Sequence, residues 1–365
     1  MTTRVSGDVP APTAPPRDRI LYADLLRIVA IATVVGLHVS SGLAGQYGAV
    51  RPDWWWVGNI LDSLTRWSVP AFIMISGMLL LGHSRDLPLG AFLRQRFVKV
   101  FIPYVFWALA VYTPWKVFYE REPFSLGRTV SEFLRGSTYY HLWFVYTIMN
   151  TYLIAPVLLV VVRHASDAVL RYYLWLWFAG LTATSLAPKF FGVTLGFSVE
   201  LTTGFVGYFV LGYYFDRVAV SPRFRRSVYV LAVACVAVTI VGTGALSGPK
   251  GALDGWFYSY LVPTTAVIAS AVFLAFRYAD WARRLRGPVS LRVVGALSAA
   301  SFGIYFVHPI VLSLLSNGAL GVTVSMTSFG SPWWGIPLTT LATFGVSFLI
   351  AALIRRLPYG PSLAP

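Results

Sequence analysis

Long apolar segments recur along this chain, and they constrain its fold more than any other feature. The mean hydropathy is +0.67 and only 12% of the residues are charged, so a soluble domain of this size could not cover its surface with polar side chains. A transmembrane helix needs roughly 20 apolar residues. We therefore expect an all-α polytopic membrane protein with about ten transmembrane helices. These helices are expected near residues 20–44, 57–82, 100–118, 141–162, 169–187, 202–216, 226–246, 256–276, 295–316 and 333–354.

The basic residues between these segments predict how the chain is oriented. Cytoplasmic loops carry an excess of Lys and Arg. If the N-terminus lies inside, 20 of the 29 Lys and Arg residues fall in inner segments and seven in outer ones. Both termini are therefore predicted to be cytoplasmic. The net charge of +15 is spread between the spans and forms no single patch, so we expect no nucleic-acid partner.

The remaining segments predict a simple domain organisation. Residues 1–19 are rich in Pro, Ala and Thr and are expected to form a disordered cytoplasmic tail. Residues 20–356 are expected to form one membrane-embedded domain, and residues 357–365 a second cytoplasmic tail. The single cysteine, Cys235, lies in an apolar stretch and allows neither an intrachain disulfide nor a cysteine metal site.

The first expected helix carries three ionisable residues, Asp24, Arg27 and His38. Ionisable side chains at membrane depth are costly, so they indicate a functional site by default. At about 100° per residue the three side chains share one helical face. The rise of about 1.5 Å per residue separates Arg27 from His38 by roughly 16 Å, about half of a hydrocarbon core. A polar stripe thus connects two depths of the bilayer.

Two further basic positions are open to more than one interpretation. Arg66, near the start of the second helix, is either a snorkelling residue at the outer interface or an anion-binding residue of a cavity. Arg96 and Lys99 lie in the inner loop before the third helix and three residues apart. They either anchor the chain at the inner surface or bind phosphate groups from the cytosol.

Two histidine segments are also candidates. His141 and Trp143 begin the fourth helix at the outer face, where they are either boundary residues or contacts for a hydroxylated substrate. His308 and Tyr305 lie in the ninth helix beside Pro309. There the histidine either satisfies backbone carbonyls that the proline frees or contributes to a site.

Motifs for other chemistries are not recognisable in the sequence. There is no nucleotide-binding loop, metalloprotease histidine pair, nucleophile elbow or calcium loop, so we expect no metal cofactor. A transporter or flippase for a glycan-related substrate could also use an intramembrane Asp, Arg and His stripe. Transporters commonly carry repeated halves, however, and the stripe in the first helix has no counterpart in the sixth. A non-catalytic subunit of a glycan-assembly complex would leave the stripe unexplained.

The order and spacing of these motifs resemble the integral-membrane acyltransferase-3 family, from about Ile20 to Arg356. The resemblance rests on the five segments Asp24-x-x-Arg27-x10-His38, Arg66-Trp-Ser-Val-Pro-Ala-Phe-x4-Ser76-Gly77, Arg96-x-x-Lys99-x-x-x-Pro103, His141-Leu-Trp-Phe and Ser-Phe-Gly-Ile-Tyr-x-x-His308-Pro. Many members have Arg where this chain has Lys99, and lysine lacks the bidentate fork of arginine. Within the family, the chain looks like the branch that O-acetylates bacterial surface polysaccharides and lipid-linked glycans.

The resemblance implies a membrane O-acetyltransferase of the bacterial inner membrane. It would transfer an acetyl group from cytosolic acetyl-CoA to a sugar hydroxyl on the outer side, beside glycan-assembly machinery. His38 maps to the family histidine and would act as general base or transient acyl carrier. Asp24 would orient Arg27, and Arg27, Arg96 and Lys99 would bind the donor. Arg66, His141 and Trp143 would serve the acceptor or the oxyanion, with His308 and Tyr305 as further candidates.

Overall fold

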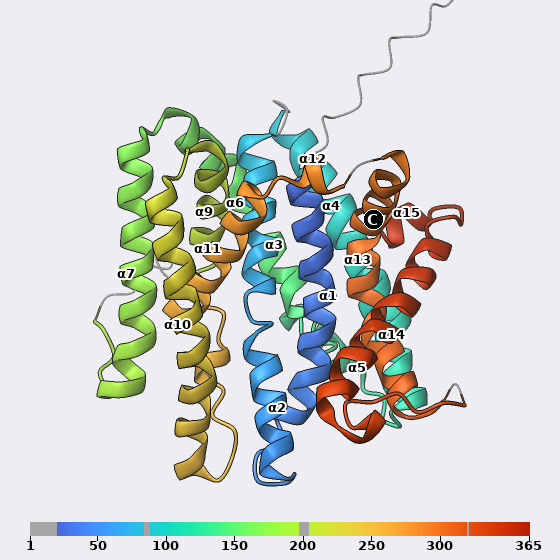
Figure 1. The fold of residues 1–365 in the computed structure, drawn as a ribbon. Helices are drawn as coiled ribbons and strands as arrows, with labels where there is room; N and C mark the ends of the chain where they lie inside the picture. Colours follow the sequence, from blue (N-terminus) through green and yellow to red (C-terminus); the bar gives the residue numbers. More distant parts are fainter. Residues whose placement is uncertain (1–19, 84–87, 197–203, 286, 320) are drawn as a thin grey trace, which may run out of the picture.

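The computed structural model describes residues 20–83, 88–196, 204–285, 287–319 and 321–365, and over these residues it is all-helical (Figure 1). The predicted tail over residues 1–19 lies outside the described residues. The long helices run side by side in a bundle. The α-helices are α1 (Leu21–Ala44), α2 (Pro52–Ser63), α3 (Ser68–Gly77), α4 (Leu89–Val105), α5 (Leu126–Arg135), α6 (Trp143–His164), α7 (Asp167–Phe191), α9 (Val206–Arg217), α10 (Pro222–Ser247), α11 (Pro263–Tyr278), α12 (Trp281–Arg284), α13 (Pro288–Ser316), α14 (Pro332–Ile354) and α15 (Gly360–Leu363).

Eight helices in the described residues are long and apolar enough to cross a membrane. The expectation of an all-α polytopic membrane protein is therefore confirmed, although about ten spans were expected. The fifth and sixth expected spans correspond to α7 and α9, which do not meet this criterion. Helix α7 carries Asp167, Arg171 and Lys189, and α9 has only 12 residues, too few to cross a hydrocarbon core.

Two of the expected spans are built differently from the prediction. The second is divided into α2 and α3 by a break over residues 64–67, and Arg66 lies in this break. The third begins at Leu89 and continues as π-helical turns, Phe106–Tyr112 and Trp115–Tyr119. Arg96 and Lys99 therefore lie inside α4 and not in a loop before it. Long basic side chains lower the hydropathy of a segment, but they can extend to the interface from a helix that continues beyond the membrane.

Helix α1 occupies the middle of the bundle, where it packs against α2, α3, α11, α13 and α14. Its core side chains include Leu26, Ile31 and Val35, none of them exposed. A helix that is apolar all round is a buried one, and α1 has apolar neighbours on every side except its polar stripe. The residues of that stripe are therefore held by a helix that packs against five others.

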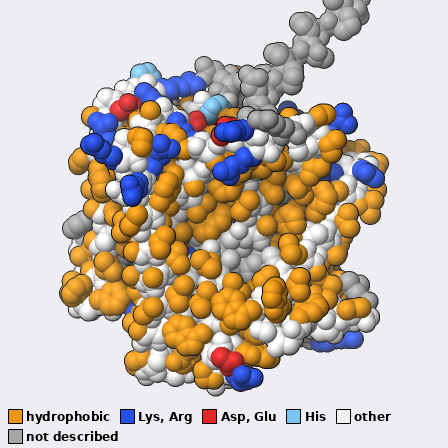
Figure 2. Space-filling view, viewed as in Figure 1, with side chains coloured by type: hydrophobic (Ala, Val, Ile, Leu, Met, Phe, Trp, Pro, Cys, Tyr) orange, Lys and Arg blue, Asp and Glu red, His pale blue; other side chains and the backbone are white. Residues whose placement is uncertain are grey.

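Charge and apolar surface are separated along the bundle axis (Figure 2). Most Lys and Arg side chains on the face shown gather at the end where α1 begins, and a broad apolar belt covers the middle. The C-terminus lies toward the same end as the start of α1 (Figure 1). Residues 357–365, expected as a cytoplasmic tail, fold back as α15 against α4. The Trp107 indole N–H donates to the Leu363 carbonyl at 2.9 Å, and Ala364 is fully buried.

Candidate active site

A cavity of about 400 Å³ brings together residues from five helices and the segments between or after helices. Thirteen of its lining residues are named positions of the five motif segments in the sequence. The lining includes Arg27, His38, Ser76, Arg96, Lys99, His141, Trp143 and Tyr305. Ligand sites are typically concave, partly apolar and of this size. The cavity is therefore the candidate active site.

One part of this cavity is strongly cationic. Arg27 of α1, Arg96 and Lys99 of α4, and Arg355 at the end of α14 all line it. No Asp or Glu side chain is among the lining residues in the described part of the chain. Sequence reasoning missed Arg355, because it read this residue only as a basic residue of the inner surface. Four cations around one cavity favour an anionic ligand such as a phosphate.

Two contacts hold Arg27 in place. The carboxylate of Asp24 lies 3.7 Å from the Arg27 guanidinium. Ser298 of α13 bridges them, because its hydroxyl accepts from Arg27 at 3.2 Å and donates to Asp24 at 2.6 Å. Asp24 itself is not among the lining residues. It therefore orients Arg27 from behind, while part of the guanidinium stays open to the cavity.

Aromatic rings and histidines line the other part of the cavity. His38 lies eleven residues beyond Arg27 on α1, and His141 faces the same space from the turn before α6. The rings of Trp143 and Tyr260 stack at 5.5 Å. The Tyr305 hydroxyl donates to the His141 carbonyl at 2.5 Å, which fixes the turn that carries His141. Aromatic faces beside hydrogen-bonding groups suit a hydroxylated ligand.

His141 is the least satisfied polar side chain of this region. It is 1% exposed, and neither ring nitrogen has a hydrogen-bond partner among the described residues. A buried polar group without a partner is costly, so such groups usually contact water or a ligand. The position of His141 in the cavity lining favours a polar ligand group there.

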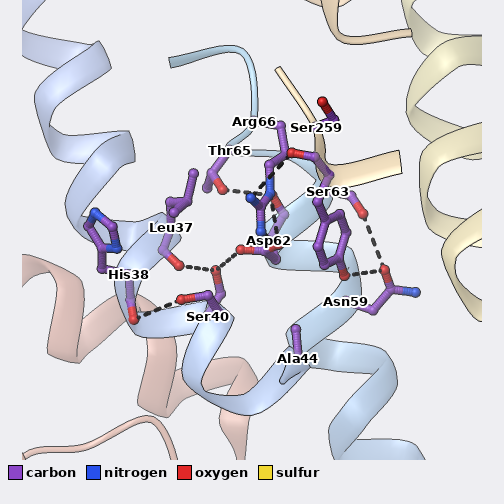
Figure 3. Close-up of polar contacts among 12 residues, drawn as sticks. Leu37, His38, Ser40, Ala44, Asn59, Asp62, Ser63, Thr65, Arg66 and Ser259 are labelled. Atoms are coloured by element: carbon purple, nitrogen blue, oxygen red, sulfur yellow. Dashed lines mark hydrogen bonds and ion pairs between the residues drawn. The ribbon is translucent and has the colours of Figure 1, made fainter. Parts of the chain in front are cut away.

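Arg66 lies outside the cavity lining and is paired within a buried network (Figure 3). Its guanidinium forms an ion pair with Asp62, donates to the Tyr258 carbonyl at 3.3 Å and stacks on the Tyr258 ring at 4.2 Å. The Arg66 side chain therefore neither extends to the membrane surface nor lines the cavity. Its predicted role toward the acceptor or the oxyanion stays a prediction.

Asp62 is a buried residue that sequence reasoning missed. It is fully buried, and it also accepts a hydrogen bond from Ser40 of α1 at 3.3 Å, two residues after His38 (Figure 3). The signal was present in the sequence, since an acid four residues before an arginine can pair with it across one helical turn. The network joins the α2–α3 break to the segment of α1 that carries His38.

His308 lies behind the cavity and is not part of its lining. Its ring is 5.2 Å from the His38 ring and 5.5 Å from the His141 ring. No three His, Cys, Asp or Glu side chains among the described residues are grouped so that they could hold a metal ion. The histidines are therefore considered as acid–base or hydrogen-bonding groups.

Comparison with known proteins gives one positive finding. The family model of the acyltransferase domain, acyltransferase-3, matches residues 20–352. No curated protein and no solved structure matches the chain. The matched residues include the whole cavity lining except Arg355 and Pro365.

Proposed function

The chain belongs to the acyltransferase-3 family and is a multi-pass membrane acyltransferase, and we propose that acetyl-CoA is its donor. The proposed acceptor is a hydroxyl group of a surface polysaccharide or a lipid-linked glycan on the outer side of a bacterial inner membrane. The observation that carries the proposal is the lining of one cavity by four cations in one part and by His38 and His141 in another.

The arrangement of the cations supports a coenzyme A donor. Its nucleotide phosphates would be bound by Arg27, Arg96, Lys99 and Arg355, as guanidinium and ammonium groups bind phosphates through charge-assisted hydrogen bonds. The pantetheine arm would then extend along α1 toward His38. The roughly 16 Å between Arg27 and His38 along the helix suits a thioester on a long flexible arm.

His38 is assigned the proton transfer. As general base it takes the proton from the acceptor hydroxyl while the oxygen forms a bond to the thioester carbonyl carbon. The carbon–sulfur bond then breaks, and the leaving thiolate takes the proton back from His38 as free coenzyme A. His141 and Trp143 hold the acceptor sugar in this proposal.

The test uses labelled acetyl-CoA added to inside-out membrane vesicles that contain the glycan acceptor. Replacement of His38 by Ala is expected to lower label transfer at least about 100-fold, the usual contribution of a general base. The matched control is His164→Ala, because His164 is exposed at the end of α6. A correctly inserted His38→Ala protein that transfers label at the wild-type rate would overturn the assignment.

A second measurement separates the two roles of His38. If its ring is itself transiently acetylated, acid quenching without acceptor should leave label on a His38 peptide. If it acts only as a base, the protein stays unlabelled although transfer proceeds when acceptor is added. Acetyl-independent movement of a glycolipid across the vesicle membrane would instead indicate a flippase.

A further inference from the structure

The sequence His308-Pro309 fixes the tautomer of a fully buried histidine. Proline has no backbone N–H, so Pro309 cannot bond the Tyr305 carbonyl four residues before it in α13. The His308 Nδ1 atom takes that place, 2.8 Å from the Tyr305 oxygen and 3.2 Å from the Ile304 oxygen. Carbonyl oxygens only accept hydrogen bonds, so Nδ1 carries the proton.

The second nitrogen of His308 is then a lone-pair acceptor. In a neutral imidazole with its proton on Nδ1, Nε2 can only accept. This atom is buried and has no hydrogen-bond partner among the described residues. The His38 ring is the nearer of its two imidazole neighbours, with planes inclined by 25°, against 78° for His141. An unused acceptor therefore lies beside the residue to which proton transfer is assigned.

We propose that His308 is a positioning residue that accepts the ring N–H of His38. The two rings are stacked with their centres 5.2 Å apart, which is about the length of one N–H···N hydrogen bond plus two ring radii. Rotation of the His38 ring until one of its nitrogens faces His308 Nε2 would therefore close the bond without a shift of either helix. The proton of His38 is then held on the nitrogen facing His308, and the opposite nitrogen presents its lone pair to the cavity.

The same contact supports the step in which His38 becomes charged. After it takes the acceptor proton, His38 has two N–H groups, and His308 Nε2 accepts the one that points away from the substrate. His308 keeps its own proton on Nδ1 throughout. Since His308 does not line the cavity, it does not touch the substrates, and in this proposal it acts through His38. This inference rests on the proposed function for the catalytic role of His38.

Two substitutions at position 308 separate positioning from a purely structural role. His308→Asn places an amide N–H near the Nδ1 position, so it retains a donor for Tyr305 and loses the acceptor. His308→Gln places its amide oxygen near the Nε2 position, so it retains the acceptor and loses the donor. A positioning role predicts that kcat falls about 100-fold in His308→Asn with KM for acetyl-CoA unchanged, and stays within about tenfold in His308→Gln. The opposite order, equal activity, or inactivity of both correctly folded variants would overturn the proposal.

A second readout does not depend on acetyl transfer. Diethyl pyrocarbonate reacts with the lone-pair nitrogen of an accessible imidazole, and mass spectrometry follows its addition to His38 in membranes. We expect the rate at His38 to fall severalfold in His308→Asn and to be retained in His308→Gln. If the modification rates follow this pattern but the protein transfers no acetyl group, His308 positions His38 and the proposed function is wrong. A change at His141 in place of His38 would overturn the assignment of the partner.

Pro309→Ala provides a variant that is expected to fold. It retains His308 but supplies Tyr305 with a backbone N–H, so the proton of His308 is no longer confined to Nδ1. We expect kcat and the diethyl pyrocarbonate rate at His38 both to fall severalfold, with no loss of thermal stability. If kcat and the modification rate of His38 both equal those of the wild type, Pro309 does not set the tautomer of His308 and the proposal fails. This test can be read even if the variants at position 308 do not insert into the membrane.

Discussion

At the scale of single residues, the buried pair of Asp62 and Arg66 shows how this protein carries charge at membrane depth. The Asp62 side chain is fully buried and that of Arg66 is 13% exposed. Ion pairs in such surroundings contribute little net stability when intact, yet removal of one partner leaves an uncompensated buried charge. The pair therefore holds the α2–α3 break in one conformation.

Replacement of Asp62 by Asn is expected to destabilise the protein by roughly 3–5 kcal/mol, because Arg66 would lose its carboxylate partner in a buried place. Thermal unfolding of the detergent-solubilised protein measures the effect. The matched control is Asp53→Asn, since the Arg51–Asp53 pair is 70% and 59% exposed and should contribute no more than about 1 kcal/mol. Equal melting temperatures for both variants would contradict this view of the network.

The sequence predicted which single residues lie together where helical periodicity alone determines their positions. Arg27 and His38 line the same cavity because both lie on one face of a continuous helix, which spacing alone predicts. Ser298 could not be found in this way. It is 271 residues from Arg27 in the chain, and one serine among many carries no signal until α13 packs against α1.

At the scale of elements, two glycines allow α3 and α9 to pack with their backbones in contact. A Cβ atom at Gly77 would lie 1.8 Å from the Phe209 carbonyl oxygen, and one at Gly212 would lie 2.0 Å from the Met74 oxygen. Neither backbone can move aside as a side-chain tip could. Small residues are the usual means of close helix packing in membranes.

Gly77→Ala is therefore expected to destabilise the protein by roughly 1–3 kcal/mol or more through overpacking. Gly345→Ala in α14 is the control, because a Cβ atom there meets no atom within 4 Å and alanine favours a helix. Melting temperatures of the two variants give the comparison. A Gly77→Ala protein as stable as Gly345→Ala would contradict the close contact.

The connection between α10 and α11 is attached to α7 by a carboxylate with two lysine partners. Asp254 lies 2.5 Å from Lys189 and 2.6 Å from Lys250. Burial raises the pKa of Asp254, but hydrogen bonds from Lys189, Lys250 and the Trp256 N–H outweigh it and lower the pKa to about 2. An unfolded aspartate has a pKa of about 3.9.

This depressed pKa predicts a loss of stability in acid. The contribution of Asp254 to the free energy of unfolding is complete above about pH 4 and disappears as the pH falls toward 2. The reason is that the folded state favours the ionised carboxylate more than the unfolded state does. Melting temperatures between pH 5 and pH 2.5 should therefore fall less steeply for Asp254→Asn than for the wild type. Parallel curves for the two proteins would show that the cluster contributes nothing.

At the scale of the whole molecule, the sequence predicted the architecture more completely than the site. The apolar segments identified an all-α membrane bundle because the hydrocarbon core imposes one length and one composition on each span. The same criterion could not show the break before α3 or the extension of α4, which depend on paired charges and snorkelling side chains. Arg355 joined the site only because the end of α14 lies beside α13, where the Arg355 guanidinium donates to the Ala299 carbonyl at 3.0 Å.

The separation of charge along the bundle predicts the side from which the donor enters. Acetyl-CoA supplied to inside-out vesicles should support transfer, whereas the same concentration given to sealed right-side-out vesicles should not, because the cationic part of the cavity faces the cytosol in the predicted orientation. Permeabilised vesicles of both kinds are the control. Equal transfer from intact right-side-out vesicles would contradict this orientation.

The continuity of α1 has one more consequence. An α-helix has a fixed rise per residue, so the distance between Arg27 and His38 cannot shorten or lengthen as substrates change. In the proposed reaction α1 therefore fixes the length that the pantetheine arm of the donor must span. An acetyl thioester on a truncated arm could reach the cations or the imidazole, but not both, and would be rejected for its length whatever its acyl group.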